Sequence, residues 1–136
     1  MTSSVTYIGD LRTEATHIRS GKSILTDAPV DNQGKGDAFS PTDLVATALG
    51  TCMLTVMGIV AQRHGIDMTG TKADVEKVMG KNPRRISEVK IHIKFKNRIM
   101  PDDRIRLERA ARDCPVGNSL HPDLKEMVKF IFNLYK

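Results

Sequence analysis

Apolar and polar residues alternate most strictly between residues 87 and 95. Every second position there is apolar, namely Val89, Ile91, Ile93 and Phe95. Since successive side chains of a strand point to opposite faces, the pattern predicts a strand with one buried and one solvated face. A strand of this kind is typical of an antiparallel sheet.

The longest uncharged stretch, residues 44–62, predicts a helix. Ser40 can cap its start, Pro41 suits the first helical position, and Asp43 completes a Ser-x-x-Asp box. Gly65 stands where such a helix would end. The length would also suit a membrane span, but threonine and glycine dilute the hydrophobicity and the rest of the chain is hydrophilic. We therefore expect a helix buried on most sides, partly by a partner subunit.

The remaining pattern places strands before and after this helix. Further strands are predicted within residues 5–18 and at 23–26, 71–79 and 128–135; a loop at 28–40; and helices from Pro101 to Pro115 and over 121–127. The order predicts an α+β fold with helices packed on an antiparallel sheet. We expect a single domain over residues 1–136.

Composition and charge narrow the function classes. The net charge is +5 and only 4% of residues are aromatic. The basic residues are dispersed, so they favour a solvated surface over a nucleic-acid site. Met1–Thr6 lacks the basic and apolar pattern of a signal peptide, and two cysteines are too few for a disulfide scaffold. We expect a cytoplasmic protein that does not bind membranes.

Two cysteines are the candidate chemical groups. Cys114 ends the apolar stripe of the second helix. Cys52 falls mid-way along the long helix, on a stripe with Val45, Ala48, Leu49, Val56 and Ile59. Both should point inward, where a cysteine commonly behaves as a small hydrophobic residue. A redox role is the alternative. The four histidines lack ligand spacing, so no metal site is predicted: His17, His64, His92 and His121.

A cysteine that attacks peroxides must be a thiolate. Burial opposes ionisation, and a mid-helix position receives no help from the helix N-terminus. A nearby cation is therefore required, and arginine is best because it stays charged. The sequence alone does not choose among Arg12, Arg19, Arg63, Arg84 and Arg85.

Two motifs resemble those of a known family. The runs Ser40–Leu44 and Ala48–Cys52 resemble the first cysteine helix of the OsmC/Ohr family of osmotically inducible and organic-hydroperoxide-resistance proteins. The run Cys114–Val116, followed by Ser119–Leu120, is similar to the second cysteine motif. The order of elements and the interval between cysteines agree along nearly the whole chain.

The resemblance implies an intertwined homodimer with central long helices and two active sites at the interface. It implies that Cys52 is the peroxidatic nucleophile and Cys114 the resolving thiol. It also implies an N-terminal arginine beside the nucleophile, for which Arg12 matches best and Arg19 second best. The implied activity is reduction of organic hydroperoxides in oxidative-stress defence, through a Cys52 sulfenic acid and a Cys52–Cys114 disulfide. Hydrogen peroxide is the alternative substrate, which the apolar stripes around both cysteines disfavour. A dithiol or thioredoxin-like protein would be the reductant, with no metal or organic cofactor.

One position departs from the family pattern. Peroxidase members carry a glutamate that holds the arginine, and here that position is Thr42. The neighbouring Asp43 could substitute, although it is also the predicted capping residue. The departure places the chain nearer the OsmC-like branch than the hydroperoxide reductases. The alternative function is a non-catalytic protein that binds a small apolar ligand at the dimer interface.

Overall fold

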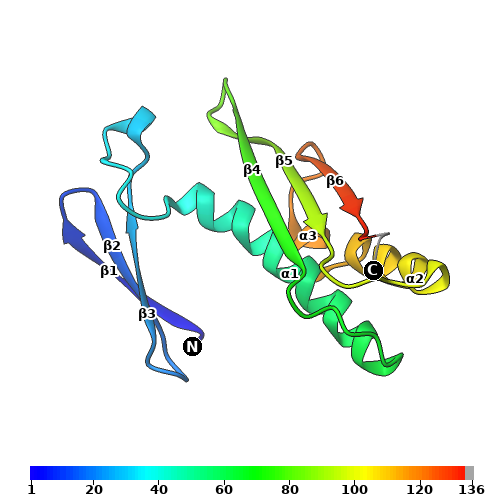
Figure 1. Cartoon of the computed structure of the whole chain (residues 1–136). Coiled ribbons are helices and arrows are strands. Elements are labelled where there is room, and N and C mark those ends of the chain that lie inside the picture. The colour runs from blue at the N-terminus through cyan, green and yellow to red at the C-terminus, as the bar shows by residue number, and fades with distance from the viewer. Residues whose placement is uncertain (134–136) are drawn as a thin grey trace. The chain divides into compact units, whose positions relative to one another are not determined.

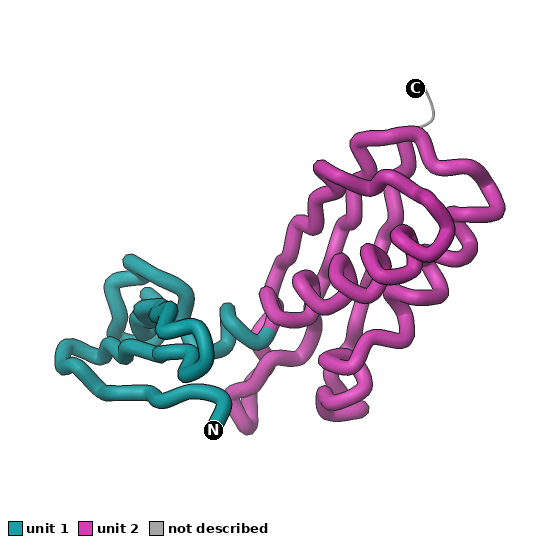
Figure 2. Tube along the Cα trace, turned by 90° about the horizontal axis from the view of Figure 1, so that it is seen from below, with its two compact units in different colours: residues 1–45 teal, residues 46–136 magenta. Residues whose placement is uncertain are grey.

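The computed structural model describes residues 1–133, and the chain forms two compact units divided between Val45 and Ala46 (Figure 2). The fold is α+β with a long helix, as the sequence predicts. The expectation of a single domain stays a prediction.

The first unit is built on a three-stranded antiparallel sheet (Figure 1). Its strands are β1 (Ser3–Gly9), β2 (Arg12–His17) and β3 (Ser23–Asp27), in the order β1-β2-β3. The loop after β3 contains the short 3-10 helix η1 (Val30–Asn32). The register pairs Arg12 with Asp27 across β2 and β3. Several apolar side chains of this sheet are exposed, namely Val5, Tyr7, Ile24 and Leu25.

The second unit contains a sheet of mixed direction. Its strands are β4 (Lys72–Gly80), β5 (Arg85–Lys94) and β6 (Lys125–Ile131), in the order β4-β5-β6. β4 and β5 are antiparallel as predicted, but β6 runs parallel to β5. This strand returns through a crossover that contains α2 (Pro101–Arg112) and α3 (Pro115–Ser119), the type of connection that parallel neighbours need.

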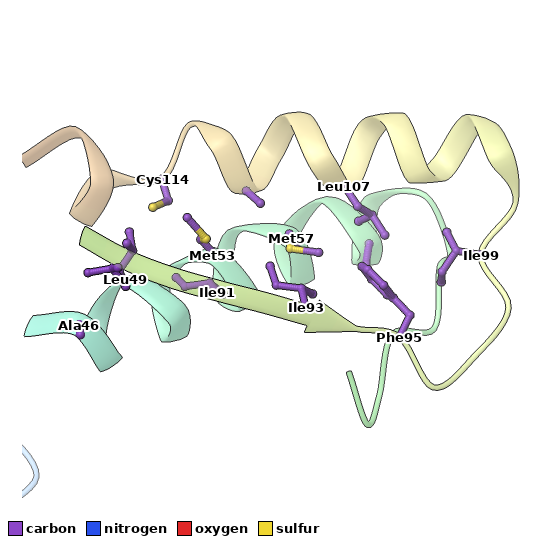
Figure 3. Close-up of a cluster of buried hydrophobic side chains, with 13 residues drawn as sticks. Ala46, Leu49, Met53, Met57, Ile91, Ile93, Phe95, Ile99, Leu107 and Cys114 are labelled. Atoms are coloured by element: carbon purple, nitrogen blue, oxygen red, sulfur yellow. The ribbon is translucent and has the colours of Figure 1, made fainter. Parts of the chain in front are cut away.

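The core of this unit lies where α1 (Pro41–Arg63), β5 and α2 meet (Figure 3). Its fully buried side chains include Leu49, Met53, Met57, Val89, Ile91, Ile93 and Leu107. The alternation in β5 therefore identified the buried face correctly.

Helix α1 begins and ends as predicted. The hydroxyl of Ser40 accepts a hydrogen bond from the Asp43 N–H at 3.1 Å, and the Asp43 carboxylate accepts one from the Ser40 N–H at 3.0 Å. This reciprocal pair is the capping box. Gly65 adopts a left-handed φ of +64°, and the Ile66 N–H donates to the Ala61 carbonyl at 2.9 Å.

The buried face of α1 differs from the predicted stripe. The inward residues are Ala46, Leu49, Gly50, Met53, Met57 and Ala61. Val45 and Ile59, expected inside with Cys52, are exposed. A helix that carries no charge on any side gives no periodic signal for the face that packs. The helix is long and apolar enough to cross a bilayer, but these six residues pack in a protein interior.

Gly50 lets α1 approach the sheet closely. A Cβ at this position would lie 2.8 Å from Cγ2 of Val75 on β4. Any side chain there would push the helix away from the strand. This contact explains a glycine in a helix interior, where it costs about 1 kcal/mol relative to alanine.

The segment after α2 differs most from expectation. The predicted helix over 121–127 is wrong, because α3 forms at Pro115–Ser119 and β6 already begins at Lys125. Pro115 ends one helix but also suits the first position of the next. The predicted strand to Tyr135 ends at Ile131, and residues 134–136 lie outside the described residues.

Two leucine-sized residues of α2 test this packing. Leu107 is 0% exposed and Ile105 is 56% exposed. We expect Leu107→Ala to lower the free energy of unfolding by about 2–5 kcal/mol, through lost burial and a residual cavity. Ile105→Ala should cost less than about 1 kcal/mol. Urea denaturation measures both, and equal losses would contradict the described core.

Candidate functional site

The thiols of Cys52 and Cys114 meet in the second unit, and both cysteines are free. Cys52 lies on α1, half-buried, and packs against the core cluster that includes Cys114. Cys114 is 2% exposed and precedes α3 as its N-terminal capping residue. The structure therefore brings together two sulfurs that are far apart in sequence.

The surroundings of Cys114 disfavour its thiolate. Burial is the main cause that raises the pKa of Cys114, and the hydrogen bond with Cys52 and the charges of Cys52 and Glu126 raise it further. The Gly117 N–H donates to the sulfur at 3.3 Å and opposes the shift. At neutral pH, Cys114 is therefore a protonated thiol.

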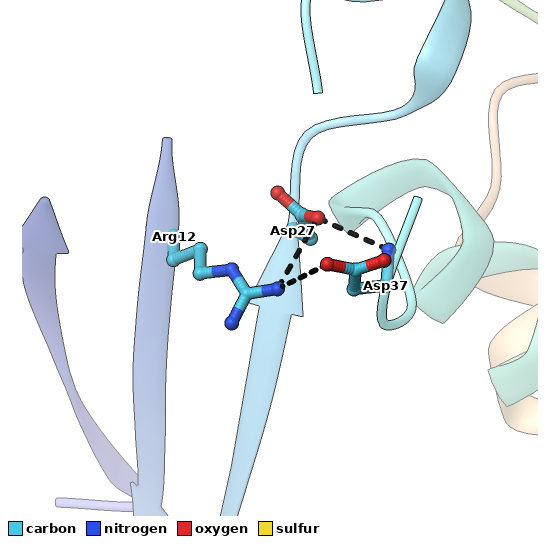
Figure 4. Close-up of polar contacts among 3 residues, drawn as sticks. All are labelled: Arg12, Asp27 and Asp37. Carbon is cyan, nitrogen blue, oxygen red and sulfur yellow. Dashed lines mark hydrogen bonds and ion pairs between the residues drawn. The ribbon is translucent and has the colours of Figure 1, made fainter. Parts of the chain in front are cut away.

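Arg12 lies in the first unit, at the start of β2, between two carboxylates (Figure 4). Its Nη2 is 2.9 Å from Oδ2 of Asp37 and 3.6 Å from Oδ2 of Asp27. Asp37 comes from the loop after β3, and Asp27 is the last residue of β3. The register of β2 and β3 places Arg12 opposite Asp27.

The Asp27 carboxylate also organises the loop. Its side chain is 1% exposed, and Oδ2 accepts a hydrogen bond from the Asp37 N–H at 3.0 Å. This bond is the main cause that lowers the pKa of Asp27, desolvation opposes it, and the charge of Arg12 lowers the pKa further. Asp27 therefore holds both the arginine and the segment that carries Asp37.

The other predicted site residues occupy different positions. Asp43 forms the capping box with Ser40 at the start of α1. The hydroxyl of Thr42, at the position of the family glutamate, lies 3.2 Å from that of Ser40. Arg19 is exposed in the turn after β2. Among residues 1–133, no group of three or more His, Cys, Asp or Glu side chains could hold a metal ion.

Sequence reasoning missed Asp27, Asp37 and Glu126. The first two are brought to Arg12 by strand register and by the loop, and the third is brought to Cys114 by the crossover into β6. The only available signal was the position of Asp27 at the end of a short predicted strand. That position does not identify the partner of an acidic residue.

Comparison with known proteins places this arrangement in a family. The family described as OsmC-like protein matches residues 34–126. A crystal structure from Psychrobacter arcticus 273-4, provisionally named an osmotic stress induced and detoxification response protein, is 53% identical over 96% of this chain and 95% of its own, with a TM-score of 0.93.

More distant structures share the fold. An organic hydroperoxide resistance protein from Elizabethkingia anophelis is 17% identical over 98% of this chain and 97% of its own, with a TM-score of 0.75. An OsmC protein from Legionella pneumophila is 16% identical over 96% and 97%, also with a TM-score of 0.75. A search of curated proteins finds no match. With its two thiols in contact and its sequence matched across both cysteine motifs, the chain belongs to the OsmC-like family.

Proposed function

We propose that the protein is a thiol-dependent peroxidase that reduces organic hydroperoxides in oxidative-stress defence. The contact between Cys52 and Cys114 carries this proposal. A buried thiol beside a half-buried thiol is the arrangement needed to form a disulfide without rearranging the fold. The apolar residues around both sulfurs, Leu49 and Met53 among them, favour an organic peroxide over hydrogen peroxide.

The reaction proceeds in two steps at these sulfurs. The Cys52 thiolate attacks the distal oxygen of the hydroperoxide, so that an S–O bond forms, the O–O bond breaks, and the alkoxide leaves as an alcohol after taking a proton. Sulfur is thereby oxidised to a sulfenic acid and the peroxide is reduced. The Cys114 thiol then attacks the Cys52 sulfur, giving a disulfide and water. A dithiol or thioredoxin-like protein reduces that disulfide by exchange.

The two cysteines are suited to different roles. The raised pKa of Cys114 keeps it protonated, which suits the thiol that resolves the sulfenic acid. The less buried Cys52 is left as the nucleophile, and its thiolate requires a positive charge. We assign that charge to Arg12, with Asp27 and Asp37 in the role of the family glutamate that is absent at Thr42.

A homodimer would bring these parts together. The first sheet exposes apolar side chains such as Tyr7 and Ile24, and α1 exposes Val45 and Ile59. Burying apolar surface stabilises by about 25 cal/mol per Å², so both surfaces favour a second copy as cover. We propose an intertwined homodimer in the cytoplasm, with Arg12 and Cys52 joined at the interface.

A groove favours a second candidate function. It lies between α1 and α2, has a volume of about 450 Å³, and is lined by Val56, Ile59, Val60, His64, Arg106, Arg109, Ala110 and Asp113. Such a groove could hold a small apolar ligand while the cysteines stay reduced. Titration of free thiols after adding a hydroperoxide separates the two functions, since only the peroxidase loses them.

Substitution of each cysteine tests the peroxidase directly. One equivalent of an organic hydroperoxide should remove two free thiols per wild-type chain. Cys52→Ser should lose essentially all turnover. Cys114→Ser should complete the first step, lose one thiol, and yield a sulfenic acid that dimedone traps. Thiol titration and mass spectrometry measure these outcomes. Equal peroxide consumption by wild type and Cys52→Ser would refute the proposal.

Substitution of Arg12 tests its assigned role. A neighbouring positive charge favours the thiolate by one or more pKa units, so Arg12→Ala should slow peroxide reduction at pH 7 by about tenfold or more. Arg12→Lys should retain part of the rate because it keeps the charge without the planar guanidinium. Arg19→Ala is the matched control and should react normally. If Arg19→Ala is the slower variant, the assignment to Arg12 fails.

Asp27 gives a prediction for acid stability. Its pKa is lower in the folded protein than the unfolded value of 3.8, so it stabilises the fold above that pH. This contribution is lost as the pH falls through the folded pKa. The stability difference between wild type and Asp27→Asn should therefore narrow below about pH 4. Urea denaturation at pH 7 and pH 3 measures it, and a constant difference would contradict the expectation.

A further inference from the structure

Glu126 lies beside the thiol of Cys114 at the start of β6. A Cβ built on Gly117 would lie 3.1 Å from Oε1 of Glu126 and 3.2 Å from Sγ of Cys114. The carboxylate and the thiol therefore both lie close to the same bare backbone position. Two segments meet there, because Cys114 caps α3 and Gly117 lies within it, whereas Glu126 belongs to β6.

Gly117 makes this approach possible. It has no side chain to crowd the carboxylate or the sulfur, and its N–H donates to Sγ of Cys114 at 3.3 Å. Its φ is not among the left-handed values of the chain, so alanine could adopt the same backbone. The requirement for glycine is thus one of space.

The charge of Glu126 acts against a Cys114 thiolate. Together with burial, which is the larger cause, and with Cys52, it raises the pKa of the Cys114 thiol. The titratable groups that act on this sulfur are thus Cys52 from α1 and Glu126 from β6. A carboxylate in this place cannot serve to ionise Cys114 in the resting protein. It can accept the proton when the thiol reacts.

We propose that Glu126 is the proton acceptor for Cys114 when this thiol attacks the sulfenic acid of Cys52. The inference rests on the proposed peroxidase function. As the S–S bond forms, the Cys114 proton passes to the Glu126 carboxylate through one bridging water. The S–O bond of Cys52 breaks, and the hydroxide takes a proton from solvent and leaves as water. No oxidant or reductant enters this step.

The location of Glu126 suits a proton acceptor. Cys114 is buried and Glu126 is exposed, so the thiol needs a route for its proton and the carboxylate can exchange it with solvent. General base catalysis of this kind typically contributes at least a hundredfold to a rate.

A single-turnover experiment isolates this step. The reduced protein is mixed with one equivalent of an organic hydroperoxide, and free thiols are counted over time. A first phase, whose rate is proportional to peroxide concentration, reports oxidation of Cys52. A second phase, whose rate does not depend on that concentration, reports formation of the disulfide with Cys114. If wild type lacks the first phase, the proposed function fails; the role of Glu126 is judged only from the second.

Two explanations of Glu126 predict opposite results. If it accepts the proton, Glu126→Gln should slow the second phase relative to the first by about a hundredfold. Its second phase should also depend more steeply on pH than that of wild type, since the reaction then needs a Cys114 thiolate. If Glu126 acts only through its charge, its removal favours the thiolate and speeds the second phase. An unchanged or faster second phase overturns the proposal.

Three further variants guard against indirect effects. Glu126→Asp keeps the carboxylate on a shorter side chain and should retain part of the second-phase rate. Gly117→Ala keeps the glutamate but adds a methyl group that crowds both the carboxylate and the sulfur, so it should slow the same phase. Glu76→Gln removes an exposed glutamate from β4 and should leave both phases unchanged. Circular dichroism confirms folding of each variant.

Discussion

The close packing of α1 against the β4–β5 sheet is the constraint on which the candidate site depends. Gly50 allows this approach by leaving room for Val75, and Met53 is buried in the resulting core. Cys52 lies between these two positions in the sequence, so the packing that buries its neighbours also fixes the position of Cys52 relative to the sheet. The same core holds α2 through Leu107, and α2 leads directly into Cys114. The meeting of the sulfurs is thus a consequence of core packing.

The electrostatic environment of Cys114, in the second unit, differs from that of Arg12, in the first. The buried sulfur of Cys114 is surrounded by influences that mainly keep it protonated, with one backbone N–H opposing them. The guanidinium of Arg12 stands between two carboxylates in the first unit. A peroxidase needs one thiolate and one thiol, because two neighbouring anions would repel each other. The environment that keeps Cys114 protonated therefore also leaves Cys52 as the thiol that can ionise.

The sequence predicted the elements that leave a local signal. Strict alternation identified the buried face of β5, and the capping box at Ser40 located the start of α1. The sequence could not select the buried face of α1, because residues 44–62 carry no charge on any side. It also could not foresee the pairing of Arg12 with Asp27, which depends on the length of the β2–β3 turn. The parallel direction of β6 was unpredictable for a similar reason, since no local sequence pattern encodes which strand will be its neighbour.

The uncharged surface of α1 links assembly to chemistry. A helix packed on one side gains nothing from apolar residues on the other, and exposed Val45 and Ile59 stay in contact with water in a single chain. A helix without charge around its whole circumference is therefore favourable only if a second surface covers its exposed side. Cys52 is half-buried on this helix, so whatever covers the outer face also closes the space around its sulfur. A cover that brings Arg12 would exclude water and supply the charge in one event, and each effect strengthens the other because charges interact more strongly in a dry site.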